Sequence, residues 1–221
     1  MIQSVSVGPI GENVYIVENP GTPVVVIDPG AEAGKLLPLI TAAVARTGAP
    51  EVILACTHGH LDHVAAIPEI TAGLGRQGIP VRIMAPEADR AYFGEAAEAT
   101  NRRVFAGIHA MEFFDRYWRP IPEAEFYYKD GDRIPGTDIQ AIHTPGHTAG
   151  SSCFLAEGGK DLLSGDTLFR DGRGRTDNFD SDEAAIISSI REKLCILPDS
   201  VRVWPGHGGQ TNIGREKPWF A

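Results

Sequence analysis

Short apolar runs that end in glycine, proline or a polar turn predict β-strands in both halves of the chain. In the first half the runs occupy residues 4–7, 14–17, 24–27, 52–55 and 81–84. In the second half they occupy residues 139–142, 152–155, 162–164 and 201–204. Several are rich in valine and isoleucine and lack alternating polar positions, which is typical of strands buried on both faces.

Between these runs, apolar residues recur every three or four positions and predict helices. The helical spacing covers residues 35–45, 64–74 and 181–194. Asp180 and Glu183 have the spacing of a capping box, so we expect them to begin the last of these helices. Two groups of strands with interspersed helices predict an α+β fold in which two packed sheets are covered by helices.

Residues 87–118 are mostly compatible with helix and, together with residues 126–128, contain ten of the 17 aromatic residues in the chain. We interpret the region around 87–128 as a helical, aromatic-rich insertion within a single domain that spans residues 1–221. Most of these rings are expected to make ordinary helix-packing contacts. Two other interpretations stay open, namely a lid over a pocket and the surface of a homodimer.

Composition narrows the function classes. The formal net charge of −9 and the pI near 5.2 argue against binding to nucleic acid. Residues 1–17 have no basic or apolar part of a signal peptide, and no apolar run approaches the roughly 18 residues of a membrane span. We therefore expect a cytoplasmic protein without a membrane partner. Cys56, Cys153 and Cys195 are odd in number and lie in apolar surroundings, so we expect buried thiols.

One loop concentrates side chains that bind metals. Residues 57–63 read Thr-His-Gly-His-Leu-Asp-His and hold three of the seven histidines in the chain. In extended backbone the side chains of His58 and His60 leave the same side, whereas Asp62 and His63 are adjacent and point differently. The loop can therefore offer two ligands to one metal ion and two to another. Neutral imidazole and carboxylate suit zinc, iron or manganese.

Three further candidates lie in the second half of the chain. His147, Asp166 and His207 each directly follow a glycine, and each comes after an apolar run. Glycine permits a tight turn and close approach of the backbone. We therefore expect the three side chains to reach the same sheet edge as the histidine-rich loop, although any one of them alone is more typical of an ordinary turn.

This combination resembles the metallo-β-lactamase fold superfamily. The likeness runs through Asp28-Pro29-Gly30, the loop 57–63, His147, Asp166 and His207 in that order. Within the superfamily, Ser-Gly-Asp-Thr-Leu-Phe at 164–169 and Gly-Arg-Thr-Asp at 174–177 are similar to the glyoxalase II (hydroxyacylglutathione hydrolase) branch. The resemblance implies an αββα four-layer sandwich with two divalent metal ions in a groove at the sheet edges.

The resemblance also implies a ligand set and a reaction. By position, the first metal takes His58, His60 and His147, the second takes Asp62, His63 and His207, and Asp166 bridges them. Water activated by the two ions then attacks a carbonyl carbon, with Asp62 and Asp166 as the catalytic carboxylates. A thioester such as S-lactoylglutathione suits this chemistry as a small-molecule substrate, because a thiolate leaves readily.

Other residues have two interpretations each. Asp28 is a candidate for orienting a ligand histidine, or simply part of an Asp-Pro-Gly turn. Arg175, with Arg170 and Arg173, is a candidate for binding a substrate carboxylate, whereas a structural ion pair of Arg175 with Asp177 is the alternative.

His143, His109 and the C-terminal residues are expected to lie outside the metal site. We expect His143 and His109 to have structural or surface roles. Full-length glyoxalase II enzymes carry a C-terminal helical domain that binds glutathione. Only fourteen residues follow His207 here, so we expect a compact form without that domain.

The same ligands are compatible with other functions. A persulfide dioxygenase uses a single iron at the first site, and a lactonase uses the same activated water on a lactone. A non-catalytic metal-binding interaction module is the third alternative, with the aromatic segment as its surface. The seven intact ligand candidates favour a catalytic function.

Overall fold

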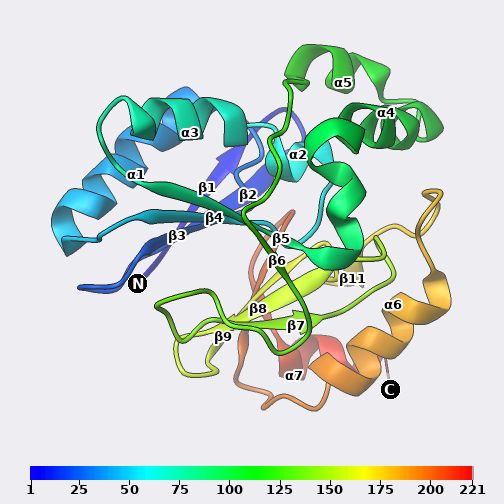
Figure 1. Ribbon diagram of the computed structural model, residues 1–221. Helices are drawn as coiled ribbons and strands as arrows, with labels where there is room; N and C mark the ends of the chain where they lie inside the picture. Colours follow the sequence, from blue (N-terminus) through cyan, green and yellow to red (C-terminus); the bar gives the residue numbers. More distant parts are fainter. Residues whose placement is uncertain (221) are drawn as a thin grey trace.

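Two β-sheets stacked face to face form the centre of the computed structural model, which describes residues 1–220. Helices cover the outer face of each sheet, so the layers run helix, sheet, sheet, helix (Figure 1). This arrangement confirms the αββα sandwich expected from the sequence.

The first sheet has six strands in the order β1-β2-β3-β4-β5-β6. They are β1 (Ile2–Val7), β2 (Glu12–Val17), β3 (Val24–Ile27), β4 (Val52–Ala55), β5 (Val81–Pro86) and β6 (Phe126–Tyr128). The first three strands pair antiparallel, and β3 to β6 pair parallel. The carboxyl ends of β3 and β4 therefore lie side by side, and the histidine-rich loop begins at this edge.

The second sheet has five strands in the order β13-β12-β9-β8-β7. They are β7 (Gln140–His143), β8 (Ser152–Ala156), β9 (Asp161–Gly165), β12 (Arg202–Pro205) and β13 (Thr211–Asn212). A small hairpin, β10 (Leu168–Phe169) with β11 (Gly172–Arg173), lies beside it. Strands β9 and β12 are parallel, so their carboxyl ends also meet at one edge.

Helices occupy three places. On the first sheet lie α1 (Ala33–Thr47), the short α2 (Leu61–Val64) and α3 (Ile67–Gly75). The aromatic-rich segment contains the 3-10 helices η1 (Glu87–Tyr92) and η2 (Gly94–Ala96), then α4 (Ala97–Gly107) and α5 (Met111–Tyr117). On the second sheet lie α6 (Glu183–Ser189), which continues into the π-helical η3 (Ile190–Leu194), then α7 (Ile213–Glu216) and η4 (Lys217–Trp219).

Strand β3 shows why the predicted strands carry no polar alternation. Val24 and Val26 pack into the core between the first sheet and its helices. Val25 and Ile27 pack into a second core between the two sheets. A third core lies under α6 and includes Ile186. Because successive side chains point to opposite faces and both faces are covered, every position of the strand must be apolar.

Two helix predictions are corrected by the structure. The helix expected over residues 64–74 begins only at Ile67, and Val64 instead ends the separate helix α2, because the Ala66 N–H donates to the carbonyl oxygen of Pro29 (3.0 Å). The last helix is capped by Asp182, which accepts from the Ala185 N–H, and not by Asp180. Asp180 instead accepts a hydrogen bond from the Tyr92 hydroxyl, 2.7 Å away. A tertiary partner thus replaces the local capping contact.

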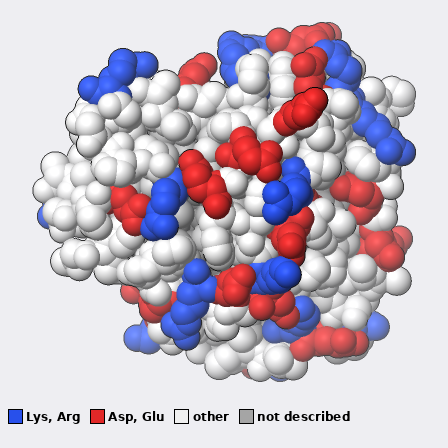
Figure 2. All heavy atoms as spheres, in the orientation of Figure 1, with Lys and Arg blue, Asp and Glu red and all other residues white. Residues whose placement is uncertain are grey.

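The charged side chains, the helices and the cysteines can be compared with what the sequence predicts. Acidic and basic side chains are intermixed on the face that Figure 2 shows. No helix among residues 1–220 is long and apolar enough to cross a membrane. All three cysteines are free thiols; Cys56 and Cys153 are buried as expected, whereas Cys195 is half-buried.

The turn after β3 lies unusually close to α2. A Cβ atom at Gly30 would lie 1.8 Å from the carbonyl oxygen of Asp62 and 2.5 Å from Oε2 of Glu12. Only glycine allows this approach, which places the start of α2 against the end of β3.

We predict that Gly30→Ala lowers the free energy of unfolding by about 3 kcal/mol or more, because the backbone of α2 has no room to move away. The matched control is Gly34→Ala, where a Cβ meets nothing within 4 Å. There the free energy of unfolding should stay unchanged or rise by up to about 1 kcal/mol. Urea unfolding of both variants measures the difference, and equal effects would contradict the steric argument.

Candidate metal centre

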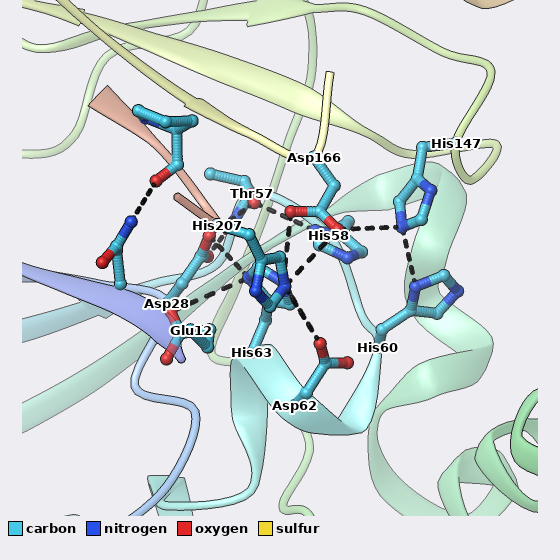
Figure 3. Close-up of polar contacts among 12 residues, drawn as sticks. Glu12, Asp28, Thr57, His58, His60, Asp62, His63, His147, Asp166 and His207 are labelled. Atoms are coloured by element: carbon cyan, nitrogen blue, oxygen red, sulfur yellow. Dashed lines mark hydrogen bonds and ion pairs between the residues drawn. The ribbon is translucent and has the colours of Figure 1, made fainter. Parts of the chain in front are cut away.

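Four loops bring the predicted ligands together at one edge of the two sheets (Figure 3). The segment after β4, a loop followed by α2, supplies four side chains, and the loops after β7, β9 and β12 supply one each. The residues are His58, His60, Asp62, His63, His147, Asp166 and His207. The segments are drawn together by contacts between the sheets, such as the Asn13 N–H that donates to the Gly206 carbonyl (2.8 Å).

The first group is formed by His58, His60 and His147. All three side chains are buried, and their ligand atoms lie within 4.8 Å of one another. Nε2 of His147 is 2.9 Å from Nδ1 of His60. Three imidazoles with no carboxylate among them form a compact nitrogen-rich site.

The second group is formed by Asp62, His63 and His207. Their ligand atoms also lie within 4.8 Å of one another. Oδ2 of Asp62 is 3.5 Å from Nε2 of His63 and 3.4 Å from Nε2 of His207. This site therefore combines two imidazoles with one carboxylate, whereas the first site has three imidazoles.

Asp166 lies between the two groups. Its Oδ1 is 3.4 Å from Nε2 of His63, and its Oδ2 is 3.5 Å from Nε2 of His147. One carboxylate thus reaches a histidine of each group, as Figure 3 shows. This is the placement that a bridging ligand requires.

The hydrogen bonds of the rings leave Nε2 available for a metal. Nδ1 of His147 is 2.9 Å from the Arg175 carbonyl oxygen, which can only accept, so Nδ1 carries the proton. Nδ1 of His63 donates in the same way to Asp28, 3.1 Å away. Nδ1 of His58 is 3.0 Å from the Thr57 hydroxyl. Such contacts fix the tautomer and the orientation of metal-binding histidines.

Several buried polar atoms of the cluster have no hydrogen-bond partner. They are Nε2 of His58, His60 and His63, and Oδ1 of Asp166. Leaving such atoms buried and unpartnered costs roughly 1–3 kcal/mol each. Divalent cations at the two groups would provide partners for Nε2 of His58 and His63 and for Oδ1 of Asp166, so the residues present fit a two-metal centre.

The pKa shifts of the cluster also favour the binding of cations. Burial and the neighbouring His147 lower the pKa of His60 to about 3, so this imidazole is neutral and ready to bind a cation. Burial alone would raise the pKa of Asp62, but the nearby His63 and His207 together outweigh it and lower the pKa to about 2. Burial would also lower the pKa of His63, yet Asp166 and Asp62 raise it well above its usual value. The carboxylates of Asp62 and Asp166 therefore favour a positive charge beside His63.

Asp28 holds the histidine-rich loop in place. Its carboxylate accepts from the Thr57 N–H (2.6 Å), the Thr57 hydroxyl (2.7 Å) and Nδ1 of His63. Asp28 also shares a possible metal-binding cluster with His58 and His63. Because both of its oxygens are already engaged, we assign it to positioning. This favours the orienting interpretation over the simple turn.

Sequence reasoning missed Asp89, at the start of the aromatic-rich segment. Its buried carboxylate accepts from the Gly59 N–H (3.0 Å), the Gly150 N–H (2.6 Å) and the Thr148 hydroxyl (2.8 Å). Gly59 lies between two ligands of the first group, and Thr148 follows the third. Burial raises the pKa of Asp89 to about 7, and the three donors oppose that rise. One side chain therefore joins both loops of the first group.

A second missed residue, Glu12, lies behind the second group. Oε1 of Glu12 is 3.9 Å from Nδ1 of His63, and both carboxylate oxygens are buried without a hydrogen-bond partner. Burial raises the pKa of Glu12 well above its usual value. The sequence carried no signal for it beyond its place at the start of β2.

A cavity of about 500 Å³ opens above the cluster. Its floor includes five of the predicted ligands, and its wall includes Val104, Phe105 and Phe113 from α4 and α5. The aromatic-rich segment thus supplies part of the wall over the site. This supports the lid interpretation for these rings, while others, such as the buried Phe114, serve ordinary packing.

The remaining candidates lie as follows. Arg175 forms a bidentate ion pair with Asp177 at 2.6 and 2.7 Å, in line with the structural interpretation of that pair. His143 is outside the cluster, with Nε2 2.9 Å from the Ala149 carbonyl oxygen. His109 is exposed, and its φ of 57° lies in the left-handed region.

Comparisons with known proteins agree with this geometry. Residues 7–207 match the family model described as the Metallo-beta-lactamase superfamily. Hydroxyacylglutathione hydrolase GloC of Haemophilus influenzae is 34% identical over 195 residues, which cover 87% of this chain and 83% of that protein. The structure of TTHA1623 in a di-iron-bound form is 31% identical, with a TM-score of 0.75 and coverage of 97% of this chain and 96% of that one. The BLEG-1 B3 metallo-beta-lactamase is 25% identical, with a TM-score of 0.82 and full coverage of both chains.

We predict that Asp89→Asn lowers the free energy of unfolding by about 1–3 kcal/mol, because the new amide group would face three hydrogen-bond donors. It should also weaken zinc binding by roughly 10- to 100-fold, as loss of an outer partner does. Thermal unfolding and competition with a chelating dye measure the two effects.

The matched control is Asp138→Asn. Asp138 is exposed and accepts from one backbone N–H, that of Gly158. Its loss should change stability by less than about 0.5 kcal/mol and leave zinc binding unchanged. Equal behaviour of the two variants would overturn the role given to Asp89.

Proposed function

This chain belongs to the metallo-beta-lactamase superfamily, and from that premise we propose that it is a metal-dependent hydrolase that cleaves a thioester. The observation that carries the proposal is the pair of three-residue groups with Asp166 between them. Two adjacent cation sites joined by one carboxylate are the arrangement that hydrolytic two-metal centres use.

Members of the superfamily bind divalent metal ions, and the residues of this chain divide between two sites. His58, His60 and His147 would hold one ion, Asp62, His63 and His207 the other, and Asp166 both. When bound, such ions lower the pKa of a coordinated water and polarise a carbonyl oxygen. Zinc, iron and manganese all suit this mixture of imidazole and carboxylate.

The side chains of the cluster position the reactants. In the proposed reaction a water oxygen bonds to the thioester carbonyl carbon, the carbon–sulfur bond breaks, and a carboxylic acid and a thiol leave. Asp62 lines the cavity and is ionised, so it can accept a hydrogen bond from the attacking water and orient it. Asp28 and the Arg175 carbonyl keep His63 and His147 in fixed orientations during the reaction.

A thioester is the substrate class best supported by the relatives. GloC of Haemophilus influenzae is named as a hydroxyacylglutathione hydrolase, and its similarity covers 87% of this chain. A thiolate is a good leaving group, so its departure needs little help from a general acid. The cavity floor accordingly carries carboxylates and imidazoles, which suffice to orient water.

The direct test is a hydrolysis screen of metal-replete protein under anaerobic conditions, with oxygen uptake recorded in a parallel aerobic sample. Thioester turnover without oxygen uptake is the expected result. Oxygen consumption with a glutathione persulfide would instead identify a dioxygenase, and turnover limited to lactones would identify a lactonase. Failure to hydrolyse any ester-type substrate would overturn the proposal.

We predict that Asp166→Ala strips metal from both sites, because a ligand common to both is lost. Its kcat/KM should fall by more than the roughly 10- to 100-fold that follows loss of an outer partner. Elemental analysis of the purified variant measures the metal content. His143→Ala is the control and should keep its metal and activity, since His143 lies outside the cluster. Retention of both ions in Asp166→Ala would contradict the bridging assignment.

A further inference from the structure

The cavity over the metal ligands has two chemically different sides. His60, Asp62, His147, Asp166 and His207 line the floor. The rest of the lining is mostly apolar and includes Ile10, Val104, Phe105, Ile108, Ala110, Phe113 and Phe169. Apolar walls around a few convergent polar groups are typical of small-molecule sites, and here the walls determine which part of a substrate fits.

Part of this apolar wall is exposed. Ile10, in the turn between β1 and β2, is 52% exposed, although most of the large apolar residues of the chain are buried. Phe113 is half-buried and stacks on Phe105, with ring centroids 5.3 Å apart and 12° between the ring planes. Part of the apolar lining is therefore open to solvent, where a ligand can cover it.

The apolar surface continues outward from the cavity. A second groove of about 720 Å³ runs along α5 and shares Ile10, Ala110 and Phe113 with the first. Met111 and Tyr117 extend its apolar lining, and His109, Glu112 and Arg116 add polar groups to it. An elongated apolar group that starts at the metal ligands can thus run past Phe113 and along α5.

The cations of the cavity are already paired. Arg173 donates to Oε1 of Glu183 at 2.5 Å, and Arg175 forms its bidentate pair with Asp177. They are the two arginines that line the cavity. The two carboxylates of a glutathione group would therefore meet arginines whose charge is already balanced, so they gain little from this wall.

We propose that the preferred substrate is a thioester with a long, apolar acyl chain, and that this chain lies against Ile10, Phe105 and Phe113. The inference rests on the proposed thioester hydrolysis and refines it. The carbonyl carbon lies at the metal ligands, the acyl chain extends along the apolar wall toward α5, and the thiol part contributes less to recognition.

The test is a series of N-acetylcysteamine thioesters from acetyl to dodecanoyl, each compared with the glutathione thioester of the same acyl group. We expect kcat/KM to rise by roughly fourfold for each added methylene until the groove is filled. The two thiols should give values within about threefold of each other at equal chain length, as the paired arginines imply.

Two exposed or half-buried positions allow substitutions that spare the fold. Phe113→Ala and Ile10→Ser should lower kcat/KM for the octanoyl thioester by about tenfold or more, and should lower it less for the acetyl thioester. The matched controls are Phe126→Ala and Ile196→Ser, at exposed residues outside both grooves. They should behave as the parent protein.

A binding measurement separates recognition from turnover. Calorimetry with the S-octyl thioether of N-acetylcysteamine, which cannot be hydrolysed, should show a negative heat-capacity change. Its Kd should weaken about tenfold in Phe113→Ala and stay unchanged in Phe126→Ala.

The possible failures are distinct. Hydrolysis of thioesters with no dependence on acyl length, or a strong preference for glutathione at equal length, would overturn this inference and leave the hydrolase intact. Absence of any thioester hydrolysis would overturn the proposed function itself.

Discussion

The buried carboxylate of Asp28 is the contact on which the site depends. It follows β3 with φ at 53°, a backbone conformation that costs energy for any residue other than glycine. In return it accepts three hydrogen bonds from Thr57 and His63. Because Thr57 in turn contacts Nδ1 of His58, a single carboxylate fixes one histidine from each group of ligands. The parallel pairing of β3 with β4 places Asp28 and Thr57 next to each other at the sheet edge.

Around this contact, the fold concentrates groups that would otherwise not be buried together. His58 lies within 4.2–4.9 Å of three other imidazoles, measured between ring centroids. Such crowding of polar rings is destabilising without a cation, and the cores on both faces of the first sheet offset that cost. Local rules of protein stability are most often broken at functional sites, and the unpartnered Nε2 atoms of this cluster follow that pattern.

The sequence predicted those features that depend on neighbouring residues. Strand β3 could be located because a buried strand appears as a short run of apolar residues. The loop 57–63 could be located because its metal-binding side chains are close together in the sequence. Asp89 could not be recognised, since its partners Gly59 and Gly150 lie 30 and 61 positions away. The cap at Asp182 and the break at Ala66 were missed for the same reason, because contacts with Tyr92 and Pro29 decide them. The cavity wall likewise depends on how α4 and α5 pack over the sheet edge.

Binding of cations at the two ligand groups is the feature on which the proposed function depends. Crystals grown with zinc and measured at the zinc absorption edge test it most directly, since anomalous scattering locates each ion without assumptions. We predict two anomalous peaks, one among His58, His60 and His147 and one among Asp62, His63 and His207, both within bonding distance of Asp166. A single peak among Asp28, His58 and His63, or no peak at the cluster, would contradict the account.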